Sequence, residues 1–234
     1  YRKIGSGSWV LLKTLGANST YYADASAKRG GTYTYTVRAI NDGVYSCFYP
    51  QGTTMKSIDA PMSLKAENRV SGVMLSWNKC AGADGYYVYR KTASGSWLRI
   101  ATVTGNANVT YLDTAAKSGQ NYTYTVKAFS GQYHSTYVLN GVTIKFLGTP
   151  KISSAVSTKN GISLKFNTVS GANGYYVYRK TLTGSWVLIG KSATGSYIDT
   201  TAQKGATYIY TVKAYSGSVL SSYYSTGLKV KDVY

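Results

Sequence analysis

The feature that most constrains this sequence is an internal repeat. The eight residues Gly85–Thr92 recur without change as Gly174–Thr181, at an offset of 89. The chain also opens on Tyr1-Arg2-Lys3, which matches the end of the same block in a third copy. A repeat of this length corresponds to one small domain per copy. The chain is therefore predicted to fold as a tandem array, in which a catalytic centre would need residues that break the repeat.

Each copy contains a segment of strict alternation, in which Tyr, Val and Ala alternate with Thr, Ile, Lys or Arg, at residues 33–39, 122–128 and 208–214. A period of two is typical of a strand with one buried face. The segment Gly72–Asn78 alternates in the same way and recurs at Gly161–Asn167. About seven short strands per copy, separated by turns, predict a β-sandwich.

An acidic residue and a glycine precede each alternating segment at fixed spacing. The Asp stands nine residues before the leading Tyr, and the Gly marks a tight turn between them. We expect each Asp to end a short strand and to accept local hydrogen bonds. The three pairs are Asp24 and Gly30, Asp113 and Gly119, and Asp199 and Gly205.

Composition supports an all-β class and a basic surface. The chain has 25 Tyr and 25 Gly but only 3 Pro, which favours strands joined by turns. Its 26 Lys and Arg against 8 Asp and Glu give a net charge of +18, which predicts a positive field that attracts polyanions. No apolar run approaches the ~18 residues of a membrane span, and the first residues show no signal-peptide pattern.

Four of these motifs together resemble a known family. They are the strand residue Trp77, the strand Gly-Tyr-x-Val-Tyr-Arg, the Tyr-x-Asp element and the strand Tyr-x-Tyr-x-Val-x-Ala. They resemble the fibronectin type III pattern in its bacterial form, and more closely the tandem repeats of secreted and surface proteins of Gram-positive anaerobes. The resemblance implies tandem immunoglobulin-like β-sandwiches of seven strands. Phe166 departs from the pattern, because it stands where Trp is usual.

The resemblance divides the chain into a partial module at residues 1–58 and full modules at 59–147 and 148–234. The partial module lacks the segment equivalent to residues 59–88, which contains two strands and most of a third. Such a half-sandwich would leave the face formed by Tyr33, Tyr35 and Val37 open to water. We therefore expect the sequence to be a piece of a longer array. Strand donation by a neighbouring molecule is the less favoured alternative.

The residues that could support catalysis are few and scattered. The 8 acidic residues do not form pairs in the repeat, and His134, the single imidazole, is expected to be an exposed turn residue. Cys47 and Cys80 are expected to lie in different modules and to stay unpaired. No metal site, no cofactor and no enzymatic activity are predicted.

Two sets of residues are candidates for ligand binding, because they recur in register on neighbouring strands. One set is basic and the other is aromatic. In the partial module the basic set comprises Arg2, Lys3 and Arg38, and the aromatic set includes Trp9. A charge-balanced surface, and Trp rings that cover a sheet edge, are the structural alternatives. The candidates in the full modules are Arg90, Lys91, Lys127, Arg179, Lys180 and Lys213, together with Tyr87, Tyr89, Trp97, Tyr176, Tyr178 and Trp186.

The function predicted from these patterns is that of a non-enzymatic stalk or adhesin segment of a larger bacterial surface protein, outside the cell. Its expected partners are further modules of the same chain and anionic polysaccharides, wall polymers, or host glycans and proteins. The alternative is an accessory spacer or binding array of a secreted carbohydrate-active enzyme or protease. Nucleic-acid binding ranks last, because a sandwich face has no groove-reading helix.

Overall fold

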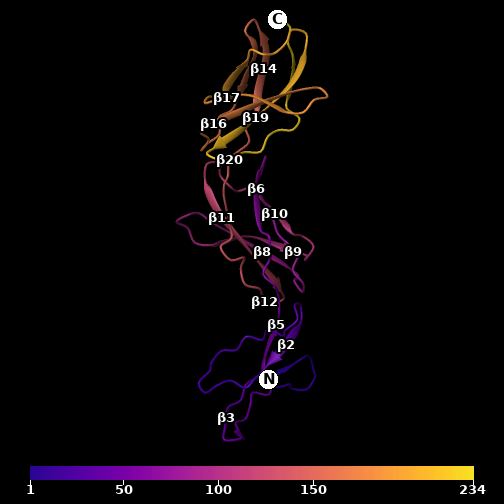
Figure 1. Ribbon diagram of the computed structural model, residues 1–234, viewed down its shortest axis with the longest axis vertical. Helices are drawn as coiled ribbons and strands as arrows, with labels where there is room; N and C mark the ends of the chain where they lie inside the picture. Colours follow the sequence, from indigo (N-terminus) through magenta and orange to yellow (C-terminus); the bar gives the residue numbers. More distant parts are fainter.

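The computed structural model describes residues 1–234 as 21 β-strands without a helix. The chain is drawn out along one axis, with β14 to β21 at one end, β6 to β13 in the middle and β1 to β5 at the other end (Figure 1). No helix is present that could cross a membrane. The all-β class and the end-to-end arrangement of sandwiches predicted from the repeat are thus what the structure shows.

The middle module consists of two antiparallel sheets packed face to face. One has the strand order β10-β7-β6 and the other the order β12-β11-β8-β9, with β13 also paired to β11. The strand β12 is a two-residue extension of a hairpin, and its presence gives eight strands where seven were expected. The strands are β6 (Lys65–Arg69), β7 (Gly72–Ser76), β8 (Gly85–Lys91), β9 (Leu98–Thr104), β10 (Thr110–Asp113), β11 (Asn121–Ser130), β12 (Tyr133–His134) and β13 (Val142–Lys145).

The last module repeats this topology with the orders β14-β15-β18 and β17-β16-β19-β20, and β21 pairs with β19. The three-stranded and five-stranded sheets, with this order of strands, form a fibronectin type III sandwich. The strands are β14 (Ile152–Thr158), β15 (Gly161–Phe166), β16 (Gly174–Thr181), β17 (Val187–Ser192), β18 (Ser196–Asp199), β19 (Thr207–Ser216), β20 (Val219–Leu220) and β21 (Leu228–Lys231).

Each full module has its own core, formed by the residues that alternation predicted to face inward. In the middle module Val73, Leu75, Tyr124 and Val126 are fully buried between the sheets. The counterpart cluster of the last module is built in the same way around Ile162 and its neighbours. Phe166 is buried at the position where the pattern expects Trp, so the core accommodates the smaller ring.

The first region forms a three-stranded sheet of order β1-β2-β5 and a separate hairpin of β3 and β4. No second sheet covers it, as the sequence predicted for an incomplete module. Val37 is 82% exposed, but Tyr33 is only 6% exposed and Tyr35 is half-buried. The expectation that this face would be open to water therefore holds for Val37 and was wrong for Tyr33 and, in part, for Tyr35. The strands are β1 (Arg2–Lys3), β2 (Thr32–Tyr35), β3 (Ile40–Asn41), β4 (Val44–Tyr45) and β5 (Thr53–Lys56).

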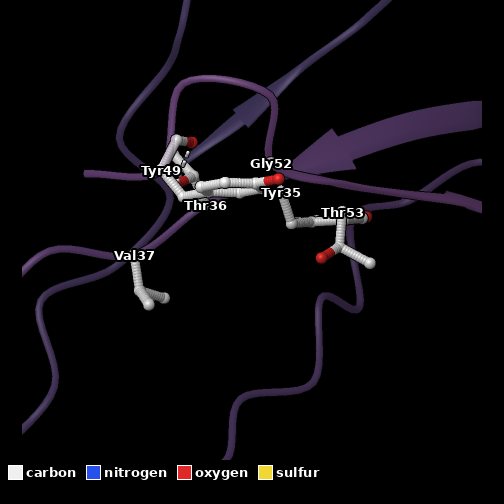
Figure 2. Close-up of a pocket in the computed structure, with 6 residues that line it drawn as sticks. All are labelled: Tyr35, Thr36, Val37, Tyr49, Gly52 and Thr53. Carbon is white, nitrogen blue, oxygen red and sulfur yellow. Dashed lines mark hydrogen bonds between the residues drawn. The ribbon is translucent and has the colours of Figure 1, made fainter.

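Tyr33 is buried by contacts within its own module. The guanidinium of Arg2 lies 4.9 Å from the centre of the Tyr33 ring, and the Tyr33 hydroxyl accepts a hydrogen bond from the backbone N–H of Lys28. Next to this sheet is a hollow of about 280 Å³, lined by Tyr35, Tyr49 and their neighbours. Figure 2 shows Val37 standing apart from the other side chains of the hollow.

Candidate ligand-binding face

The predicted aromatic residues and lysines come together on the outer face of the larger sheet in each full module, whereas the predicted Arg90 and Arg179 do not. On β8, Tyr86 and Val88 are fully buried, whereas Tyr87 and Tyr89 are on the opposite, partly exposed face. Because β8 pairs with β11, Tyr87 lies directly opposite Lys127. The same arrangement holds in the last module, where Tyr176 lies opposite Lys213.

In the middle module each basic side chain on this face lies over an aromatic ring. The Nζ atom of Lys91 is 4.8 Å from the centre of the Trp97 ring, and the Nζ atom of Lys127 is 4.9 Å from that of Tyr137. Tyr89 packs edge-on against Tyr137, with ring centres 5.3 Å apart. These side chains therefore form one continuous surface of rings and cations.

The last module repeats these pairs. The Nζ atom of Lys180 is 5.0 Å from the centre of the Trp186 ring, and that of Lys213 is 4.6 Å from Tyr223 and 5.7 Å from Tyr178. The repeat of the lysine–tryptophan pair extends to Lys3 and Trp9 in the first region. We call these surfaces of the two full modules the aromatic–cationic face.

The sequence reasoning missed several members of this face. Tyr137 and Tyr223 recur in register before the last strand of each module, so the repeat contained the signal for them. Arg99 lies 4.8 Å from the Tyr87 ring, and Lys191 lies 5.2 Å from the Tyr176 ring. These two cations occupy different positions in their modules, so no repeated pattern indicated them.

The Trp rings combine the two roles that the sequence left open. Trp186 reaches over the turn before β21, where a Cβ on Gly227 would meet its ring at 3.0 Å. Trp186 remains half-exposed there, and its counterpart Trp97 is 42% exposed. A ring that rests on the sheet edge and still presents one side to water is fixed in position at little entropic cost. Such a ring, next to an ammonium group, can stack on a sugar face while the cation contacts an anionic substituent.

The two arginines of the predicted set have a different arrangement. A guanidinium nitrogen of Arg90 lies 2.7 Å from Oδ2 of Asp113, and that of Arg179 lies 2.7 Å from Oδ2 of Asp199. Their side chains are only 19% and 21% exposed. Their charge is neutralised inside the module, so Arg90 and Arg179 contribute less to the basic face than the sequence led us to expect.

Each Asp also accepts a hydrogen bond from a buried tyrosine. The hydroxyls of Tyr124 and Tyr210 donate to Asp113 and Asp199 at 2.7 Å. Burial, together with this hydrogen bond, raises the pKa of both tyrosines. We call each set of Arg, Asp and Tyr a triad, and the third triad consists of Arg2, Asp24 and Tyr35.

Asp113 and Asp199 end their strands and form local turns, as predicted. Asp24 also accepts a local hydrogen bond, from the backbone N–H of Ser26, but it ends no strand, so that part of the prediction was wrong for the first region. Oδ1 of Asp199 accepts hydrogen bonds from the backbone N–H and the hydroxyl of Thr201. Burial opposes ionisation of Asp199, but the hydrogen bonds from Thr201, Tyr210 and Arg179 outweigh it and lower the pKa of the carboxyl group. Because the carboxylate is fully paired, the triad fastens two sheets together and has no free group for chemistry.

The remaining reactive side chains are isolated. His134 is exposed, as predicted, but it lies in the strand β12 and not in a turn. Its ring centre is 5.6 Å from that of Tyr87, and partial burial and the charge of Lys127 lower its pKa. Cys47 is exposed and Cys80 is buried, and both are free thiols. No group of three or more His, Cys, Asp or Glu side chains comes together.

Fold and face together define a tandem array of fibronectin type III-like sandwiches. No known family model matches the chain. The chain is similar to Exoglucanase B of Cellulomonas fimi. The identity is 27% over an alignment of 231 residues, and this alignment covers 85% of the present chain. It spans only 20% of the length of that protein.

Solved structures resemble the chain at low identity. The structure of the FN1-FN3 domains of chicken CNTN1 matches with 17% identity and a TM-score of 0.38. The match covers 88% of this chain and 79% of the CNTN1 chain. A segment of two fibronectin type III domains from chicken tenascin matches 74% of this chain and 99% of its own length, with 16% identity and a TM-score of 0.38.

Proposed function

We propose that the chain is a non-catalytic spacing and binding array of an extracellular, carbohydrate-associated bacterial protein. The similarity to part of Exoglucanase B supports the accessory role over the adhesin role among the two predicted from the sequence. In this proposal the modules hold a separate functional domain at a distance from the wall or from its substrate.

The observation that supports binding is the repetition of the aromatic–cationic face. The pairs Lys91–Trp97 and Lys180–Trp186 have nearly the same geometry, at 4.8 and 5.0 Å. Each such pair is worth about 0.5–1 kcal/mol at an exposed site, so neither defines a strong site alone. Two faces on one chain add through effective concentration. The ligand class that matches rings and cations is an anionic polysaccharide.

A binding experiment with defined polymers tests the proposal. Affinity electrophoresis of the 234-residue chain in gels containing polygalacturonate, lipoteichoic acid or a neutral cellulose derivative measures retardation by each polymer. We expect retardation by the anionic polymers that weakens between about 0.02 and about 0.15 M salt, because the charge contribution is screened. Equal migration in all gels at both salt concentrations would exclude the binding role and leave the spacer role.

Variants separate stacking from charge. The double substitution Trp97→Ala and Trp186→Ala removes both rings of the repeated pairs, and we expect it to abolish most of the retardation. The matched control replaces Leu98 and Val187 by Ala, since these neighbouring side chains are 61% and 60% exposed and have neither a ring nor a charge. Replacing Lys91 and Lys180 by Gln tests the charge, and its effect should disappear at the higher salt concentration.

A second candidate function, the stalk of a surface adhesin, is favoured by the contacts between modules. Lys56 donates a hydrogen bond to Ser130, and Lys145 donates one to Ser216, so both junctions are bridged. Bridged modules project a terminal domain more effectively than freely tumbling ones. The domain adjacent to the array in the full protein discriminates the two: a hydrolase domain supports the accessory role, and a wall anchor supports the stalk.

A further inference from the structure

The two junctions between modules are built from the same contact between glycines. Gly30 and Gly119, in the turn before the alternating strand, each meet a glycine of the following module, Gly82 and Gly171. A Cβ on Gly82 would lie 2.4 Å from Cα of Gly30, and one on Gly171 would lie 2.3 Å from Cα of Gly119. No side chain fits in either place, so backbone packs directly on backbone.

The residues around these glycines are repeated as well. The backbone N–H of Gly30 donates to the carbonyl of Ser57, and that of Gly119 donates to the carbonyl of Phe146. Lys56 and Lys145 occupy equivalent positions and each reach a serine of the next module, at 2.6 and 2.7 Å. The junction is thus a specific interface that is reproduced at both places.

Leu147 shows how well the second junction is closed. It is fully buried, although it lies beyond β13 and belongs to neither hydrophobic cluster. Next to it, Ser118 accepts a hydrogen bond from the N–H of Gly148 and donates one to the carbonyl of Ser170. The linker is therefore held between the two modules.

The far pole of the last module has the same construction without a partner. Gly205 has a φ of 83°, close to the 87° of Gly119, and its N–H donates to the carbonyl of Asp232 at 2.8 Å. No heavy atom lies within 4 Å of a Cβ placed on Gly205. Val233, the counterpart of Leu147, is 57% exposed, and Lys231, the counterpart of Lys145, is also exposed.

We propose that this pole, formed by Gly205, Lys231 and Val233, is a docking surface for one further module of the same repeat class. The incoming module would place the glycine of its turn, the counterpart of Gly82 and Gly171, against Gly205. Lys204 directly precedes Gly205, as Arg29 directly precedes Gly30. At the first junction a guanidinium nitrogen of Arg29 lies 2.8 Å from Oδ2 of Asp59, the first residue of the middle module. The pole therefore fits best a module that begins with an acidic residue. The proposal does not depend on the binding function proposed above.

An extended chain tests the proposal directly. A copy of residues 59–147, which begins with Asp59, is joined after Val233, in a background with Cys47→Ser and with Cys80→Ala in both copies. Spin labels at Thr143 and Lys165, both exposed, report on the existing junction. Labels at Lys229 and at the added copy's counterpart of Lys165 report on the new one. We expect both pairs to give distance distributions of equal width. A distribution several times broader at the new junction would overturn the proposal.

A glycine substitution tests the contact itself. Asn tolerates a positive φ, so Gly205→Asn adds a side chain with little backbone strain. We expect it to broaden the distribution at the new junction and to leave the unfolding of the 234-residue chain unchanged. The matched control is Gly43→Asn, at a φ of 80° and also without neighbours, which should change neither distribution. A distribution that stays narrow in Gly205→Asn would contradict the glycine contact.

Discussion

The first region and the middle module contain nearly the same alternating sequence in different surroundings. In the middle module this sequence forms β11, a strand of 10 residues, and Val126 is fully buried. In the first region the strand β2 has only 4 residues, and the equivalent Val37 is 82% exposed. The comparison teaches that alternation defines which side of a segment can be buried, whereas the length of the strand depends on the sheet that covers it.

The largest expected effect comes from placing a charge at these two valines. Val126→Asp buries a carboxylate without a partner, which costs several kcal/mol and is expected to unfold the middle module. Val37→Asp should be nearly neutral, because the side chain is already in water. Hydrogen exchange measured by mass spectrometry resolves each module separately. If the amide protons of β2 are protected from exchange and Val37→Asp removes that protection, this face is covered in solution.

The two cysteines extend the comparison to chemical reactivity. Cys47 is exposed in the first region, whereas Cys80 is 2% exposed in the core of the middle module, where burial raises the pKa of its thiol. We expect a maleimide to label Cys47 at least about 1,000-fold faster, because labelling of Cys80 requires the module to open. Single-cysteine variants measured by mass spectrometry give the two rates. Comparable rates would mean that the core of the middle module opens readily.

The triads provide a third comparison, because all three regions contain one. In the middle module the side chain of Asp113 is 2% exposed, and in the first region that of Asp24 is 7% exposed. Asp113→Ala leaves Arg90 without its counter-charge and should destabilise the module by about 3 kcal/mol. Asp24→Ala should lower the free energy of unfolding by less, since the first region has fewer buried contacts to lose.

Denaturant unfolding, followed module by module through hydrogen exchange, measures the two losses. The double variant Asp113→Ala with Arg90→Met serves as the control, because it removes both charges and should recover much of the stability. No recovery in the double variant would mean that the hydrogen bond from Tyr124, rather than the ion pair, accounts for the loss.

The sequence predicted the fold better than it predicted the candidate face. The alternation of Tyr86 with Tyr87 was enough to assign the inner and outer sides of β8, because side chains on a strand alternate by geometry alone. The ion pair of Arg90 was missed, because its partner Asp113 lies 23 residues away on the opposite sheet. The repetition of Arg, Asp and Tyr in all three copies was the available signal. Of the junction glycines, Gly30 and Gly119 were recognised only as turns and Gly82 and Gly171 not at all, since their contacts lie between modules.

The smallest expected effect concerns the tyrosines of the triads in alkaline solution. Burial and the hydrogen bond to Asp24 raise the pKa of Tyr35 to about 12, from an ordinary value of 10.0. A raised pKa stabilises the folded state below pH 10, and this contribution is lost as the pH rises toward 12. The pKa of Tyr124 is raised further, so it should not ionise while its module is folded. The two regions should therefore titrate differently.

Ultraviolet absorbance of tyrosinate, measured against pH, tests this difference. Tyr35→Phe should remove an ionisation near pH 12, whereas Tyr124→Phe should leave that step unchanged. On the acid side, burial opposes ionisation of Asp24, but the hydrogen bonds from Ser26, Tyr35 and Arg2 lower its pKa to about 2. A lowered pKa stabilises the folded state above pH 4, and acidification toward pH 2 removes that contribution. If Tyr35 ionises near pH 10 instead, its hydroxyl is not bonded to Asp24, and the first region lacks the triad that the full modules contain.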